Sequence, residues 1–355
     1  MNAGELSTLL VWAAGLTYTI ALVAYTTVLA RIAEARPRAA KAAAAVTSPP
    51  VAAPVAGVSV AASVAVGAGR TAVLDRPSGA STPPAAGGSA GASIGADAGA
   101  PDAGRRAAGI ARSMTYLGLT FGFVAVVLRG IAAGRWPTAN MYEFTLVGST
   151  MAIAVLVLVQ RRNQIPFLGV LVTGAAALAL FLGVNVFYIR AEGVQPALQS
   201  YWLVIHVGVA ITSSGIFAVA AATSVVQLMR ARREEGSTLL AGRRWGWIDA
   251  VPDSRTLEAL SFRLNAVGFV LWTFTLIAGS IWAEHAWGRY WGWDPKEVGT
   301  FVVWVIYAAY LHARTTRGWA GSRAAYFVLV GFTAVIANFT VINLFVTGRH
   351  SYSGI

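Results

Sequence analysis

Eight long apolar stretches dominate this 355-residue chain. An α-helix needs roughly 20 predominantly apolar residues to cross the ~30 Å hydrocarbon core of a bilayer. The stretches cover approximately residues 6–30, 110–132, 142–160, 165–189, 201–229, 264–285, 298–313 and 324–347. Because 56% of the residues are hydrophobic and only 12% are charged, the composition excludes a water-soluble chain. The sequence therefore predicts an all-α, polytopic integral membrane protein with about eight transmembrane helices.

The composition divides the chain into three parts. Residues 1–32 are expected to form the first transmembrane helix. Residues 33–109 are expected to form a disordered, cytoplasmic linker rich in Ala, Pro and Gly, because residues 39–108 contain few large apolar side chains and no aromatic residue. Residues 110–355 then form a domain of seven helices.

The basic residues predict the orientation of the chain in the membrane. With eight spans both termini lie on the same side, and outer termini put 21 of the 27 Lys and Arg residues on the cytoplasmic side. The positive-inside rule favours this orientation. The net charge of +12 is thus explained as a topology signal, and no nucleic-acid partner is needed.

An aromatic segment, residues 282–297, faces outward in this topology and carries four tryptophans and one tyrosine. One interpretation is an interfacial belt of aromatic side chains. The other is a flat aromatic shelf for a large planar apolar ligand, since Gly288 and Gly292 allow the backbone to approach closely. Asp294 and Pro295 suit the N-cap and the first position of the next helix. Asp294 therefore has two candidate roles, capping this helix and contacting the ligand.

Four histidines can be placed on the same map. His206 and His350 lie near the outer ends of separate stretches, and His285 lies at the outer end of the sixth. A lone histidine in a membrane bonds a neighbouring helix or serves a functional site. His206 and His350 on either side of the aromatic segment fit a haem with two axial imidazoles. His312 is 18 residues beyond Asp294, ~27 Å along a helix, and implies a second, inner site or a structural role.

Several cations on the predicted outer face can pair with the propionates of a haem. They are Arg129, Arg135, Arg289, Lys296 and Arg349. We favour Arg289, which lies inside the aromatic segment, and expect Arg129 to snorkel to the headgroups. Glu143 can orient an arginine or bond the backbone of its loop.

Two segments carry a resemblance to a known family. Residues 287–297 read Trp-Gly-Arg-Tyr-Trp-Gly-Trp-Asp-Pro-Lys-Glu, and residues 310–314 read Tyr-Leu-His-Ala-Arg. They resemble the WWD motif of the haem-handling cytochrome c biogenesis proteins, most closely the CcsA (ResC) branch of the System II cytochrome c synthase, also labelled CcsB in some lineages. Residues 137–143, 200–206 and 348–352 resemble further elements of that branch.

The resemblance implies roles for individual residues. His206 and His350 would be axial ligands of an outer haem iron. His312 would ligate an inner haem iron together with a residue of a partner. The residues implied as the binding platform of the outer haem are Trp287, Trp291, Trp293 and Asp294.

The implied function is that of a haem-handling subunit of a cytochrome c synthase, which moves haem b to the outer face for thioether attachment to a Cys-x-x-Cys-His apocytochrome c. The implied partner is a CcsB/ResB-type membrane protein, and the complex would act as a haem lyase. The expected location is the plasma membrane, with the WWD loop at 282–297 on the extracytoplasmic side. Because the chain contains no cysteine, both sulfurs must belong to the substrate.

Two alternatives remain open at the level of the sequence. One is a haem-binding chaperone or exporter of the CcmC kind, which has no ligase activity. The other is a multi-span transporter with an aromatic interface loop, which would bind no haem.

Overall fold

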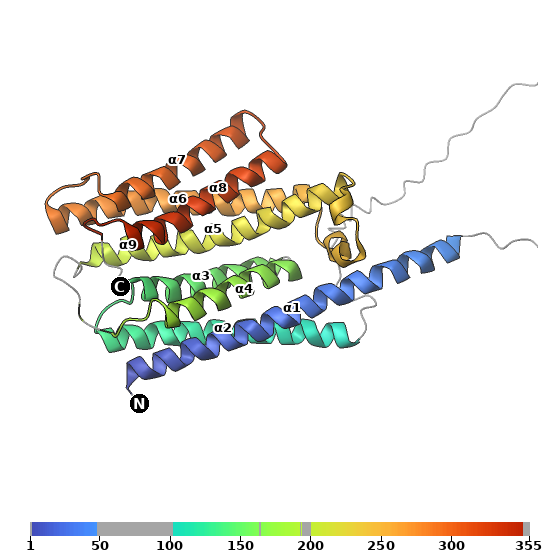
Figure 1. Ribbon diagram of the computed structural model, residues 1–355, viewed down its shortest axis with the longest axis horizontal. Helices are drawn as coiled ribbons and strands as arrows, with labels where there is room; N and C mark the ends of the chain where they lie inside the picture. Colours follow the sequence, from blue (N-terminus) through green and yellow to red (C-terminus); the bar gives the residue numbers. More distant parts are fainter. Residues whose placement is uncertain (1, 48–101, 163–164, 192, 194–199, 351–355) are drawn as a thin grey trace, which may run out of the picture. The chain divides into compact units, whose positions relative to one another are not determined.

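The computed structural model describes residues 2–47, 102–162, 165–191, 193 and 200–350, and the regular structure in these residues is helical throughout (Figure 1). Two compact units are distinguished, residues 1–36 with 99–355, and residues 37–98. The helices are α1 (Ala3–Thr47), α2 (Asp102–Ala133), α3 (Met141–Arg162), α4 (Pro166–Asn185), α5 (Tyr201–Glu234), the 3₁₀ helices η2 (Thr238–Leu240) and η3 (Arg243–Ala250), α6 (Ser254–Trp287), α7 (Pro295–Thr316), α8 (Ser322–Phe339) and α9 (Val341–Phe345).

Seven helical segments of the described chain are long and apolar enough to cross a membrane. They are α1 to α6 and Ser322–Phe345, which comprises α8 and α9. The all-α, polytopic prediction is confirmed. The eighth expected span, residues 298–313, lies within α7. This helix has charged residues near both ends and is not among the seven segments that are apolar enough to cross a membrane. The side of the membrane on which the termini lie stays a prediction.

The ends of the expected linker differ from the prediction. Helix α1 continues to Thr47 and α2 begins at Asp102, so residues 33–47 and 102–109 are helical where no regular structure was expected. Alanine has the highest helix propensity, and both segments are rich in it. Residues 48–101 lie outside the described residues, and the remainder of the linker stays a prediction.

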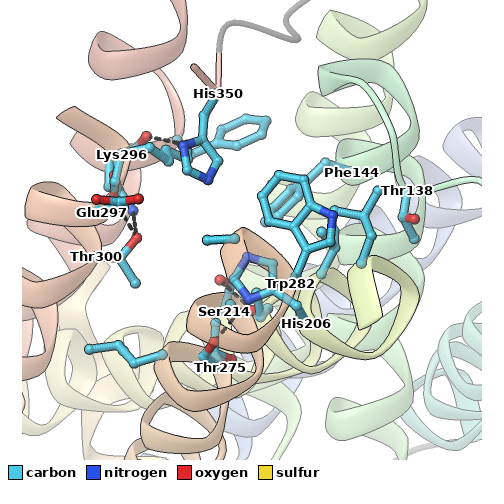
Figure 2. Close-up of a pocket in the computed structure, with 18 of the residues that line it drawn as sticks. Thr138, Phe144, His206, Ser214, Thr275, Trp282, Lys296, Glu297, Thr300 and His350 are labelled. Atoms are coloured by element: carbon cyan, nitrogen blue, oxygen red, sulfur yellow. Dashed lines mark hydrogen bonds between the residues drawn. The ribbon is translucent and has the colours of Figure 1, made fainter. Parts of the chain in front are cut away.

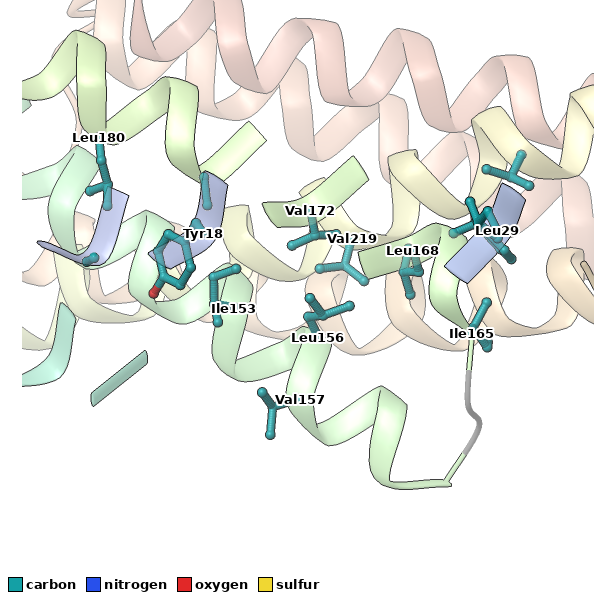
Figure 3. Packing of buried hydrophobic residues seen from close by; sticks show 14 of the residues in the cluster. Tyr18, Leu29, Ile153, Leu156, Val157, Ile165, Leu168, Val172, Leu180 and Val219 are labelled. Carbon is teal, nitrogen blue, oxygen red and sulfur yellow. The ribbon is translucent and has the colours of Figure 1, made fainter. Parts of the chain in front are cut away.

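Helix α5 packs most extensively against α6 and also contacts α3 and α8. On one side of α5 an apolar cluster joins it to α1, α3 and α4, with Tyr18, Ile153, Val172 and Val219 among its buried members (Figure 3). Many large apolar side chains of the helices are exposed, among them Leu16, Phe123 and Leu158, as expected for helices surrounded by lipid.

On another face of α5 a second cluster joins it to α6, α7 and α8. Phe217 stacks on Tyr307 of α7, with ring centroids 3.8 Å apart and an angle of 7° between the planes. Gly268 of α6 makes this stack possible, because a Cβ atom there would lie 2.6 Å from the Phe217 ring. The contact fixes α7 against the α5–α6 pair, and the first turn of α7 forms part of the site described next.

Candidate functional site

A pocket lies among α3, α5, α6, α7 and α8 (Figure 2). Its empty space, including the part open to solvent, is about 1210 Å³. Two of the four histidines, His206 and His350, line it together with the aromatic side chains of Trp282 and Trp291. In Figure 2 the two imidazoles lie above and below the open space, with Trp282 beside them. His206 and His350 thus line the same pocket, and their binding of one metal ion stays a prediction.

His206 is fixed by a bond to the backbone of the neighbouring helix. Its Nδ1 lies 2.9 Å from the carbonyl oxygen of Thr275 on α6. A carbonyl can only accept a hydrogen bond, so Nδ1 carries the proton and Nε2 keeps its lone pair. Gly279 gives the ring its space, because a Cβ atom there would lie 2.7 Å from the His206 Cε1. The imidazole also stacks on Trp282, with centroids 6.1 Å apart and planes at 8°.

His350 is held by a hydrogen bond to the side chain of Asp294. Its Nδ1 lies 2.7 Å from Oδ1 of Asp294. An ionised carboxylate only accepts, so this imidazole also donates from Nδ1, and in its neutral form the lone pair lies on Nε2. Its ring lies 4.9 Å from the ring of Trp287 and 5.5 Å from that of Trp282, measured between centroids. Both pocket histidines thus lie beside the same tryptophan, Trp282.

Asp294 caps α7, one of the two roles considered for it, and a contact with a ligand stays a prediction. It caps α7 by accepting from the Lys296 amide at 3.0 Å, and Glu297 completes a capping box by accepting from the Asp294 amide at 3.0 Å. Its Oδ2 accepts from the Arg349 amide at 2.6 Å, beside the bond to His350. Burial alone would raise the pKa of Asp294, but the hydrogen bonds from His350, Arg349 and Lys296 lower it to about 2. The carboxylate therefore stays charged and connects residues 349–350 to the start of α7.

The tryptophans of residues 282–297 do not form one flat shelf. Helix α6 continues to Trp287, so Trp282 and Trp287 stand on its last turns, with their ring planes at 65°. Trp291 lines the pocket and meets Trp293 edge-on, at 86°. Trp293 itself is 76% exposed and has a φ of +58°, a rare conformation for a bulky residue. Trp282, which is 1% exposed, is the tryptophan that contacts both histidines, and the sequence analysis did not single it out.

The other two histidines lie away from this pocket. His285 is exposed, and its Nδ1 bonds the carbonyl of Ile281 in its own helix at 2.8 Å and lies 3.2 Å from a Glu284 oxygen. His312 is exposed near the end of α7. Within the described residues no group of three or more His, Cys, Asp or Glu side chains is arranged to hold a metal ion. An inner haem on His312 stays a prediction that needs a ligand from elsewhere.

A buried ion cluster lies behind the wall of the pocket that is formed by the start of α3 and the loop before it. Glu143 is fully buried and bonds Nε of Arg129 at 3.0 Å and Nη1 of Arg135 at 2.7 Å. It also accepts from the amide of Ala139 at 2.9 Å, while the Asn140 side chain accepts from the Glu143 amide at 2.9 Å. Glu143 thus orients arginines and bonds loop backbone at once. The expectation that Arg129 snorkels is wrong, because it is 1% exposed and paired.

Residues 138–350 match the family described as Cytochrome C assembly protein. A curated relative from Prochlorococcus marinus, "Cytochrome c biogenesis protein CcsA", is 31% identical over 250 residues, which cover 64% of this chain and 79% of the relative. The protein of the same name from Synechococcus elongatus is 33% identical over 268 residues, which cover 63% of this chain and 81% of that one.

Among solved structures, "Cytochrome c Heme Lyase CcmF" is similar with a TM-score of 0.59 and 14% sequence identity. The match covers 96% of this chain and 47% of that one, so this chain spans about half of CcmF, and the likeness concerns the fold. The fold and the pocket define a multi-pass helical membrane protein with a histidine- and tryptophan-lined site. The chain belongs to the cytochrome c assembly protein family, and its role lies in cytochrome c maturation.

Replacing Glu143 tests the ion cluster behind the pocket wall. Glu143→Gln leaves two guanidinium groups without their carboxylate, and removing one partner of a buried pair costs about 3–5 kcal/mol. We expect a lower thermal unfolding midpoint in detergent. Glu284→Gln removes an exposed carboxylate and is the matched control, for which we expect an unchanged midpoint. Equal midpoints for both variants would contradict the structural role of the cluster.

Acidification tests the carboxylate that holds His350. Because the pKa of Asp294 is lowered from 3.8 to about 2, its hydrogen bonds stabilise the docked chain end above pH 3.8 and are lost as the pH falls toward 2. The chain has no native cysteine, so a spin label on the exposed Thr347→Cys reports this segment alone. The label should gain mobility only in that acidic window. In an Asp294→Asn background the transition should be absent, and its persistence there would refute the assignment.

Proposed function

We propose that this protein is a haem-handling subunit of a cytochrome c synthase. In this proposal it holds haem b at the outer face of the plasma membrane and presents it to a Cys-x-x-Cys-His apocytochrome c. The observation that carries the proposal is the state of the two pocket histidines. The Nδ1 atoms of His206 and His350 are both engaged with acceptors, Thr275 and Asp294, so that in the neutral imidazoles Nε2 is the atom that can bind a metal.

The donor set suits a haem iron. Two imidazoles are an established axial pair for haem, and the polarity and hydrogen bonding around them tune the metal. Aromatic side chains next to both histidines, foremost Trp282, provide apolar surface for a macrocycle. The CcsA relatives, named for cytochrome c biogenesis, support haem as the cargo.

The chemistry assigned to the chain is positioning. Thioether formation adds a thiol across a haem vinyl group, with a carbon–sulfur bond formed at one vinyl carbon and the thiol proton ending on the other. Because the chain has no cysteine, both thiols come from the apocytochrome. Holding the reactants in place lowers the barrier of such a step. We infer that the histidine of the incoming Cys-x-x-Cys-His segment replaces His206 or His350 on the iron.

The proposal includes a second haem contact and a protein partner. His312 is exposed on α7, about 18 residues from Asp294 and hence ~27 Å along the helix, so it belongs to a separate site. Its second ligand would come from a CcsB/ResB-type membrane protein. In support, His312 belongs to no group of three or more His, Cys, Asp or Glu side chains that could hold a metal ion within the described residues.

Removing either axial histidine tests the proposed function. For His206→Ala and for His350→Ala we expect the haem content of the purified protein to fall at least about tenfold. Added imidazole should restore haem, because it replaces the lost ligand in the space left by the side chain. The matched control is His285→Ala, an exposed histidine outside the pocket, which should keep its haem.

The same variants are to be scored for covalent haem attachment after co-expression with an apocytochrome c and a CcsB/ResB-type partner. We expect attachment to fail in both pocket variants and to proceed in the control. Unchanged haem content and attachment in both pocket variants would contradict the proposal. Haem binding without attachment in the wild-type complex would favour a chaperone or exporter of the CcmC kind.

A further inference from the structure

One cation lines the pocket from the first turn of α7. The ammonium of Lys296 donates to the carbonyl oxygen of Asn338 at 2.7 Å and to Oδ1 of Asn343 at 3.0 Å. Both acceptors are neutral. An ammonium has three N–H donors, and these two bonds leave one for a further acceptor.

The charge of Lys296 has no carboxylate partner within 4.0 Å among the described residues. Asp294, two positions earlier, directs its oxygens at His350 and at the amides of Arg349 and Lys296. Glu297 turns one oxygen to the amides of Gly292 and Asp294. A partly buried cation without a paired anion is costly, so an anionic group in the pocket would be stabilised there.

The other cations predicted for the outer face point elsewhere. Arg289, which the sequence analysis favoured, packs its guanidinium over Gly292, where a Cβ atom would overlap it, and does not line the pocket. Arg349 lies over the ring of Trp287, with its Cζ 5.8 Å from the centroid. Arg129 and Arg135 are paired with Glu143. Within the described pocket lining, Lys296 is the only Lys or Arg.

We propose that Lys296, oriented by Asn343, binds a carboxylate of the pocket ligand, and that this contact selects porphyrins with free propionates. The inference rests on the proposed haem-handling function. In Figure 2 Lys296, Glu297 and Thr300 lie on one side of the pocket, and Trp282 and Phe144 lie on the other. A ligand with apolar and carboxylate edges, such as haem, matches this division. The contact between Lys296 and a propionate places the propionate edge of the macrocycle next to α7.

The test compares haem with haem dimethyl ester, in which both propionates are esterified. The purified full-length protein is titrated with each and the ratio of the two dissociation constants is measured. We expect the wild type to prefer haem by about 10–100-fold, as for a hydrogen bond between charged groups. Lys296→Met should bring the ratio close to one, and Lys296→Arg should retain a preference for haem. Arg190→Gln, which removes an exposed cation outside the pocket lining, is the matched control and should keep the wild-type ratio.

Three results would overturn the inference. Equal affinity of the wild type for haem and its ester would do so without any variant, even if Lys296→Met fails to fold. An unchanged ratio in Lys296→Met would do so as well, while leaving haem binding through His206 and His350 intact. Failure of the wild type to bind either porphyrin would contradict the proposed function itself, and with it the ligand on which this inference depends.

Discussion

The carboxylate of Asp294 connects the parts of the site to one another. It begins α7, accepts the amide of Arg349 and holds the imidazole of His350, so one charged group links the α6–α7 loop to the end of the described chain. Gly348 is needed beside it, because a Cβ atom there would lie 2.6 Å from Oδ2 of Asp294. Without this group His350 would have no fixed tautomer and no fixed position relative to Trp282 and His206.

The remaining helices act as a frame for this arrangement. His206 and Trp282 stand on α5 and α6, the most extensively packed pair of helices, and the Phe217–Tyr307 stack holds α7 against them. The buried cluster around Glu143 fixes the loop that closes another wall of the pocket. Ligands on rigid helices keep their geometry better than ligands on loops, and His350, which lies outside a helix, is supported by the carboxylate of Asp294 in the role we propose for it.

Hydropathy alone predicted the helical class and nearly all of the helices, because crossing a bilayer demands long apolar runs. The convergence of His206 and His350 followed from topology and the resemblance to haem-handling proteins. The bond between Asp294 and His350 joins residues 56 positions apart, which no local pattern encodes. The extension of α6 to Trp287 and the angles between the tryptophan rings depend on packing and were missed, while Lys296 was only one of five candidate cations. Arg129 was misjudged because its partner, Glu143, lies on another helix.

The central claim is that His206 and His350 bind one haem iron through their Nε2 atoms. A cryo-electron microscopy structure of the haem-loaded protein tests it most directly. We expect iron density between the two Nε2 atoms, with the bonds from Nδ1 to Thr275 and Asp294 preserved. Haem bound elsewhere in the chain, or iron coordinated by neither imidazole of this pocket, would contradict it.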